Sequence, residues 1–439
     1  MHVLLIIARC LALLTICLGM ATLPSDKEEP IGLYRVMGDI REIPMPRSTV
    51  LEGVGNGFVE ITANPGQVGE LRAQGYVVEA QPQPKVAVDS GYHTYAAMAD
   101  DIAAVAAAHP GIVSTFSIGT SYQGRALLAA KLSDNVASDE QEPEVLLVGH
   151  YHAREHLTVE MMLASLHMLV DGYGTADHAS IDQLVNTREI WLVFDMNPDG
   201  GEYDITGDIY RNWRKNMQPS GCGYSDSGYG YGSGIDLNRN HSYRWGYDDG
   251  GSSGDLCSET YRGPNAASAA EVAALEQFVS SRVVGGTQQI TAAISFHTYG
   301  ELVLWPYGYT TSTTPEDMPA ADAEALAALG QAMAAANGYT AEQASALYPT
   351  NGDFSDWAYG SQHIFGYTFE MSGYHNGTFY GFYPPSAAIK SETARNREAV
   401  LLLIRHAGCP YGLIGQAASY CATAPYEPQQ STWLPIIAH

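Results

Sequence analysis

The chain has 439 residues, of which 46% are hydrophobic and 16% charged, and its formal net charge is −26. Such a chain can bury a substantial core, and it lacks the Lys and Arg clusters that bind phosphates, so nucleic acid is excluded as an expected partner. An acidic surface attracts cations, structural Ca²⁺ included, but it also simply keeps a protein soluble, and both interpretations stay open.

Residues 1–22 are typical of a secretory signal peptide. The apolar run Cys10–Met20 follows Arg9, and Pro24 ends it. The run is too short to span a membrane and no other segment is long enough, so we expect a secreted protein that does not enter the membrane. A bacterial lipoprotein signal at Cys17 is disfavoured, because Ile16 is too large for the position before a modified cysteine.

Residues 23–91 have a pattern of their own. The segments Phe58–Ile61 and Tyr76–Glu79 alternate as strands do, and Gln67–Gln74 between them predicts a short helix. The sequence Gln81–Pro84 is typical of a stiff linker. We therefore predict a small α+β unit that ends at a linker.

Residues 92–408 alternate helices with apolar strands. Helices are predicted over Ala96–His109, Thr158–Val170, Ala320–Asn337 and Ser386–Arg405. Buried strands are predicted over Glu144–Val148, Glu189–Asp195, Ile290–His297 and Ile364–Glu370. This order is typical of an α/β fold with a mixed, mostly parallel twisted sheet and helices on both faces. We expect a turn at Asn197–Gly200, a long surface loop at Ser220–Gly234 and a short tail over 409–439.

Four cysteines remain beyond the signal peptide: Cys222, Cys257, Cys409 and Cys421. An even count in an exported chain predicts two disulfides, and four cysteines allow three pairings. Proximity in sequence favours Cys222–Cys257 and Cys409–Cys421, with buried free thiols as the alternative.

The sharpest local pattern is His152-Ala153-Arg154-Glu155-His156, directly after a predicted buried strand. Ligand sites of open α/β sheets lie beyond the strand ends. A hydrolytic zinc site needs about three protein ligands. His152 and Glu155 supply two, and His297, which ends another predicted strand, is the natural third.

A second interpretation is the inverted zincin pattern, in which His152 and His156 bind the metal and Glu155 is the base. That pattern requires both histidines on one helix. The predicted helix begins only at Thr158, so we favour Glu155 as a ligand and His156 as a structural or orienting residue.

The chain resembles the zinc carboxypeptidase family of the pancreatic A and B type, and within it the secreted bacterial carboxypeptidase T. The resemblance runs from about Tyr92 to Arg405. It is carried by ordered blocks at Gly149–His156, Asn197–Gly200, Tyr210–Asn216, Asp236–Asn240, Cys257–Gly263, Ser295–Tyr307, Gly352–Tyr359 and Thr368–Glu370. It implies one Zn²⁺ per chain and removal of the C-terminal residue from peptides and proteins with a free C-terminus.

The resemblance also implies the catalytic roles. The zinc ligands are His152, Glu155 and His297. Glu370 is the general base that activates the zinc water, and Arg214 polarises the scissile carbonyl. Asp236 either orients a ligand imidazole or caps a turn. The family disulfide matches Cys222–Cys257.

Substrate-binding roles follow in the same way. Asn238 and Arg239 match the pair that holds the terminal carboxylate, and a guanidinium beside an amide suits that task. Tyr348 matches the mobile tyrosine that closes over the substrate. Further groove residues are Arg154, Arg211 and Tyr299.

The specificity pocket is expected around Asp353 and Ser355. Ser355 is small and neutral, and an Asp353 carboxylate could pair with Lys or Arg while apolar walls remain, so we expect broad specificity for hydrophobic and basic C-terminal residues. The alternative is that Asp353 merely caps the turn after Asn351-Gly352.

By position and size, residues 23–91 resemble the family's activation segment. This implies a zymogen that an activating protease cuts, with a separate binding module as the alternative. The resemblance also implies a monomeric enzyme.

Two other functions stay open for the whole chain. One is a relative that cuts amide bonds in small acylated amino acids or cell-wall peptides, and the other is a catalytically inactive binding protein.

Overall fold

The computed structural model describes residues 32–45, 49–81, 86–175, 179–223 and 232–421. The predicted signal peptide, most of the predicted linker, part of the predicted loop Ser220–Gly234 and the end of the tail lie outside these residues. Within the described part of the chain, no helix is long and apolar enough to cross a membrane.

The centre of the molecule is an eight-stranded sheet in the order β13-β12-β14-β11-β7-β8-β6-β5. Its strands are β5 (Val113–Thr120), β6 (Ala126–Leu132), β7 (Glu144–Gly149), β8 (Glu189–Val193), β11 (Ile290–Thr298), β12 (Leu302–Trp305), β13 (Thr340–Gln343) and β14 (Phe365–Met371). The four central strands β8, β7, β11 and β14 run parallel, whereas β12, β6 and β5 add antiparallel pairs. The predicted mixed, mostly parallel sheet is confirmed.

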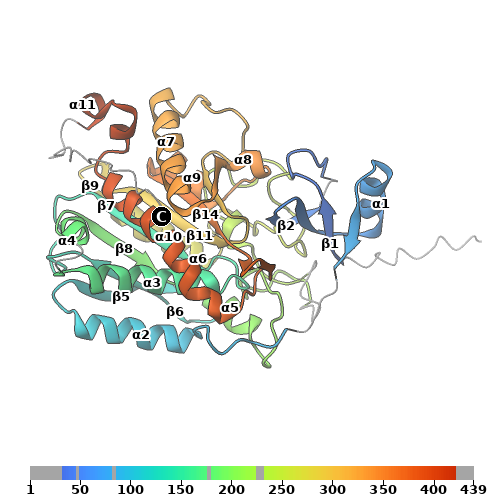
Figure 1. Cartoon of the computed structure of the whole chain (residues 1–439), viewed down its shortest axis with the longest axis horizontal. Coiled ribbons are helices and arrows are strands. Elements are labelled where there is room, and N and C mark those ends of the chain that lie inside the picture. Colours follow the sequence, from blue (N-terminus) through green and yellow to red (C-terminus); the bar gives the residue numbers. More distant parts are fainter. Residues whose placement is uncertain (1–31, 46–48, 82–85, 176–178, 224–231, 422–439) are drawn as a thin grey trace, which may run out of the picture.

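Helices cover both faces of this sheet (Figure 1). One face carries α2 (Tyr95–Ala108), α3 (Leu157–Gly172), α4 (Ala179–Val185), α7 (Ala320–Asn337) and α10 (Ile389–His406), and the other carries α6 (Ala270–Ser281) and α9 (Phe354–Gln362). Along β7, Val145 and Leu147 pack on the first face, while Leu146 and Val148 pack on the second. Burial on both faces explains the continuous apolar run in the sequence.

Shorter elements connect these layers. They are α5 (Pro198–Asp204), η2 (Leu237–Arg239), β9 (Val283–Val284), β10 (Thr287–Gln288), α8 (Ala344–Leu347), β15 (Tyr374–His375), β16 (Thr378–Phe379), η3 (Ser386–Ala388), η4 (Pro410–Ile414) and α11 (Ala417–Tyr420). The turn predicted at Asn197–Gly200 is wrong, because this segment starts helix α5. The Asn197 side chain accepts the Gly200 N–H at 3.1 Å, and Pro198 occupies the first helical turn.

A small unit precedes the sheet and lies beside the main body (blue in Figure 1). It consists of an antiparallel sheet in the order β2-β3-β1-β4 and one helix. The elements are β1 (Gly32–Met37), β2 (Val50–Gly55), β3 (Phe58–Ala63), α1 (Pro65–Ala73) and β4 (Val78–Ala80). We call these elements together the N-terminal unit. Val36, Ile61 and Leu71 are fully buried in its own core.

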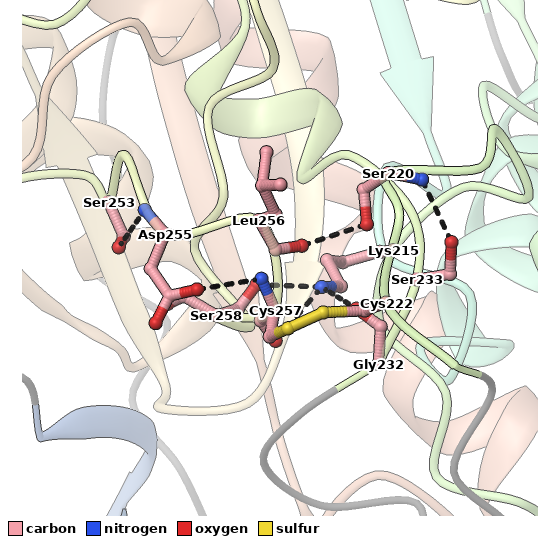
Figure 2. The surroundings of a disulfide bond; sticks show 10 residues. All are labelled: Lys215, Ser220, Cys222, Gly232, Ser233, Ser253, Asp255, Leu256, Cys257 and Ser258. Carbon is pink, nitrogen blue, oxygen red and sulfur yellow. Dashed lines mark hydrogen bonds between the residues drawn. A yellow bond between two sulfur atoms is a disulfide. The ribbon is translucent and has the colours of Figure 1, made fainter.

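Both favoured disulfides form, Cys222–Cys257 and Cys409–Cys421. Figure 2 shows the first, with the buried Lys215 ammonium beside it. Lys215 Nζ donates to the carbonyl oxygens of Ser258, at 2.7 Å, and of Gly232. The disulfide loop is therefore anchored to the residue that follows Arg214.

Candidate metal and active site

Three predicted metal ligands meet at the carboxyl edge of the sheet. His152 and Glu155 lie in the loop between β7 and α3, and His297 lies near the end of β11. Because β7 and β11 are parallel neighbours, their carboxyl ends reach the same edge. The three side chains are buried and form one group with ligand atoms within 4.8 Å of one another.

The donor atoms face one another closely. The Nδ1 atoms of His152 and His297 are 3.3 Å apart. The Glu155 carboxylate oxygens lie 2.8 Å from His152 Nδ1 and 3.1 Å from His297 Nδ1. Two imidazole nitrogens and a carboxylate that converge in a buried space fit a zinc ion, which prefers such ligands. Burial lowers the pKa of His297, which favours the neutral imidazole that binds metals.

The outer nitrogens of both rings have protein partners. His152 Nε2 lies 3.2 Å from an Asp236 carboxylate oxygen, and His297 Nε2 lies 3.0 Å from the Ser295 hydroxyl. Such partners fix the ring orientation of metal-binding histidines. Asp236 fulfils both predicted alternatives, because the same oxygen also accepts the Asn238 N–H at 3.0 Å as the cap of η2.

His156 does not belong to this group. Its Nε2 lies 2.9 Å from Asp204 Oδ2, and its ring packs against that of Tyr210. It also precedes α3, so His152 and His156 do not share a helix. The geometry disfavours the inverted zincin pattern.

The described residues contain two further acidic groups, Asp134–Glu140–Glu142 and Asp139–Glu144–Glu189. Arg282 pairs with Asp139 and Glu144, and Lys131 Nζ lies 2.7 Å from Glu189. Protein cations thus already neutralise the second group. No finding on the described residues supports the interpretation that the acidic surface binds structural Ca²⁺.

Glu370 lies directly beside the ligand group. In the parallel pair β11–β14 it is the register partner of His297, so both side chains point to the same face of the sheet. It is half-buried, whereas the other residues of β14 are buried. No described residue hydrogen-bonds to its carboxylate. Burial, together with the nearby Glu155 charge, raises the pKa of Glu370 well above its usual range.

Two arginines flank this centre. Arg214 donates from Nε and Nη2 to one oxygen of Asp236, at 3.1 and 2.9 Å, so Asp236 links it to His152. Burial opposes the charge of Arg214, but Asp236 holds its pKa above the ordinary value. Arg239 Nη2 donates to the Tyr348 hydroxyl at 3.1 Å.

The Arg239 guanidinium has one N–H group that makes no hydrogen bond to the described residues. Its Nε is buried and has no hydrogen-bond partner among the described residues. A buried donor without a partner is costly, so this group is suited to an anionic ligand. Asn238, its neighbour, uses its amide oxygen to accept the Phe354 N–H at 2.9 Å. The structure therefore brings Asn238, Arg239 and Tyr348 together as expected.

Two predicted groove residues contact the N-terminal unit. Arg154 Nη2 is bonded to Glu52, and the Tyr299 hydroxyl donates to Glu60 at 2.6 Å. These two carboxylates were not predicted, and no local pattern marks them. The third predicted groove residue, Arg211, has its guanidinium carbon 5.0 Å from the Tyr203 ring centre.

Asp353 caps helix α9. One carboxylate oxygen accepts the Asp356 N–H and the Ser355 hydroxyl, both at 2.9 Å, and the other accepts the Thr350 hydroxyl at 2.7 Å. The capping alternative is therefore seen directly. A contact with a basic substrate side chain stays a prediction.

Comparisons with known proteins agree with this geometry. The family described as zinc carboxypeptidases matches residues 98–399. A zinc carboxypeptidase of Saccharothrix mutabilis subsp. capreolus is 42% identical over 81% of this chain and 83% of its own. Rat carboxypeptidase A2 is 30% identical over 68% of this chain and 66% of its own. Carboxypeptidase A from Helicoverpa armigera has a similar fold, with a TM-score of 0.69 at 21% identity, over 86% of this chain and 98% of its own.

Proposed function

We propose that this chain, a zinc-dependent exopeptidase of the zinc carboxypeptidase family, is made as a secreted zymogen. Once cut, it would remove hydrophobic and basic C-terminal residues from peptides. The removal of C-terminal residues is supported most by the arrangement of Arg239 and Tyr348 beside His152, Glu155 and His297. A group that binds a free carboxylate next to a hydrolytic metal site selects for C-terminal bonds.

His152, Glu155 and His297 would hold the zinc ion, which when bound acidifies water and polarises a carbonyl oxygen. Arg239 binds the terminal carboxylate, with Tyr348 moving from its present contact to cover the substrate. Arg214 donates to the oxyanion that develops on the scissile carbonyl. Glu370 takes a proton from the attacking water and passes it to the leaving amine as the C–N bond breaks.

The complete set of side chains argues against the two rival functions. A catalytically inactive binding protein has no need of Glu370 beside three buried metal ligands. An enzyme for amide bonds in other small molecules has no need of the Arg239–Tyr348 arrangement. We therefore prefer a peptide substrate with a free C-terminus.

The zymogen proposal, with residues 23–91 as activation segment, 92–408 as catalytic domain and 409–439 as tail, is supported by the contacts of the N-terminal unit. Its strand β2 carries Glu52, which reaches Arg154, while Leu51 packs near Leu347 and Tyr348. The unit thereby covers residues that the substrate must reach. The two disulfides and residues 1–22 support secretion.

We expect the uncut chain to be on the order of 100-fold less active than protein cut near Pro84–Tyr92, because substrate binds only in the small fraction of molecules whose N-terminal unit has moved away. The end of the activation segment contacts the catalytic domain, since Val88 N–H donates to Asp208 O and Tyr210 N–H donates to Val86 O. The measurement is kcat/KM on an N-blocked dipeptide for both forms, at equal zinc content. Equal values would reduce the N-terminal unit to a folding aid or a separate module.

Broad specificity is tested with Asp353→Asn. Asn caps helices as well as Asp, so this variant removes the charge and preserves the cap of α9. If the carboxylate pairs with basic side chains, kcat/KM for C-terminal Arg falls by about 1–3 kcal/mol of transition-state binding, while Leu and Phe substrates are nearly unchanged. Equal losses on both substrate classes would show that Asp353 is structural only.

A further inference from the structure

Helix α5 ends at Asp204, whose carboxylate is completely buried and has no part in the mechanism proposed above. Its Oδ1 accepts the Trp213 N–H at 2.7 Å, and its Oδ2 lies 2.9 Å from His156 Nε2. The Tyr383 hydroxyl lies 3.2 Å from Oδ1 and 3.1 Å from Oδ2. Burial of a carboxylate is costly unless donors surround it, and these contacts hold the group in one orientation.

The Trp213 N–H lies where the chain turns toward Arg214. Asn212, directly before it, has a left-handed backbone with a φ of 57°. Residues other than glycine seldom adopt this conformation, although Asn tolerates it better than most. A backbone that turns in this way needs contacts that hold it. The hydrogen bond to Asp204 is such a contact, and it acts one residue before Arg214.

Both ends of α5 contact the segment that carries Arg214. At the start of the helix, Asn197 Nδ2 donates to the Lys215 carbonyl oxygen at 3.2 Å. At the end of the helix, Asp204 accepts the Trp213 N–H. Arg214 lies between these two attachment points in the chain. The helix therefore braces the backbone on either side of this arginine.

This brace complements the contact at the other end of Arg214. Asp236 accepts two N–H groups of the guanidinium, whereas Asp204 acts on the backbone. In the proposed mechanism the guanidinium donates to the oxyanion, and such a donor is effective at about 2.7–3.1 Å. A backbone shift of about 1 Å would take it out of this range, and misplacement on that scale is costly in rate.

We infer that Asp204 is a positioning residue of the reaction. Through Trp213 it fixes the backbone of Arg214, so that the guanidinium meets the oxyanion, and it acts through this arginine and not on the substrate. The inference rests on the proposed exopeptidase function and adds to it a residue from outside the predicted site. The alternative is a carboxylate that contributes stability only.

The first experiment measures kcat, KM and thermal stability of the cut, zinc-loaded enzyme on one N-blocked peptide. We expect Asp204→Ala to lower kcat about tenfold and to change KM little, because Arg239, which binds the terminal carboxylate, belongs to η2 and not to the braced segment. Asp204→Asn has the same size and keeps an oxygen for the Trp213 N–H, so it should retain most of kcat.

Glu144→Ala is the matched control. Glu144 is also completely buried and accepts the Trp191 Nε1–H at 2.8 Å, but it lies at the amino end of β7, opposite the metal-binding loop. This variant should lower thermal stability and leave kcat unaltered. An equal fall of kcat in Glu144→Ala would show that loss of stability alone lowers kcat, and would overturn the inference.

The second experiment repeats Asp204→Ala in Arg214→Gln. If Asp204 acts through Arg214, the double variant has the kcat of Arg214→Gln alone, because nothing is left to position. A tenfold loss that persists in this background, or an unaltered kcat in the single variant Asp204→Ala, would overturn the inference. Asp204→Ser, whose oxygen is one bond shorter, replaces Asp204→Ala in both backgrounds if the latter does not fold. Absence of hydrolysis by the unaltered cut enzyme would instead overturn the proposed function.

Discussion

Removal of the metal by a strong chelator should abolish peptide hydrolysis, and added zinc should restore it. His152, Glu155 and His297 are buried, and their ligand atoms lie within 4.8 Å of one another. In the proposed mechanism, hydrolysis depends on a water that the zinc ion acidifies. The measurement is the initial rate together with metal analysis of the same sample.

Calcium provides the matched control for this experiment. Ca²⁺ prefers oxygen ligands, whereas two of the three donors here are imidazole nitrogens, so it should not restore the rate. Full activity in a sample shown to contain no zinc would contradict the assignment of the metal site.

The second large effect is expected for Glu370→Gln. Gln has the size of Glu and still forms hydrogen bonds, but it cannot take a proton from water. We expect kcat to fall by at least about 100-fold while substrate binding is largely kept. The measurements are kcat and KM on one blocked peptide, with zinc content checked.

His156→Ala is the matched comparison. In the present geometry His156 binds Asp204 and packs against Tyr210, so its loss should lower stability more than it lowers kcat. The inverted zincin pattern predicts the reverse, a small effect at Glu370 and loss of zinc at His156. A kcat for Glu370→Gln close to that of the unaltered enzyme would therefore exclude the role given to Glu370.

The central part of the fold was predictable because its signals are local. The strands β7 and β11 are continuous apolar runs that end in His-containing segments, and α7 has the bounds predicted for it. A strand buried on both faces has few other interpretations, and its carboxyl end gives the position of the site. For this reason the predicted ligands His152, Glu155 and His297 could be grouped before any geometry was known.

Other elements gave no clear signal. Strand β5 lies at the edge of the sheet and is mostly exposed, so it lacks an apolar run. Strand β6 is rich in Ala and Leu, residues that favour helices, and only its pairing with β5 and β8 makes it a strand. Asn197-Pro198 fits a turn and a helix start equally well by composition.

Contacts between distant segments were beyond sequence reasoning. Glu52 and Arg154 are 102 positions apart, and Glu60 and Tyr299 are 239 apart. Both acids occupy strands in which nothing distinguishes a solvated carboxylate from one that docks on another unit. The double use of Asp236, as a cap and as a partner of His152 and Arg214, likewise appears only when the loop and the sheet edge meet.

The most direct test of the account compares two peptides that differ only at the C-terminus. The cut, zinc-loaded enzyme is incubated with an N-blocked peptide that ends in Phe with a free carboxylate, and with the same peptide as the C-terminal amide. Because Arg239 carries a buried donor suited to an anion, we expect release of free Phe from the acid and at least about a 100-fold lower rate on the amide. Equal rates on the two peptides, or cleavage at an internal bond, would contradict the conclusion that this chain is a carboxypeptidase acting through Arg239.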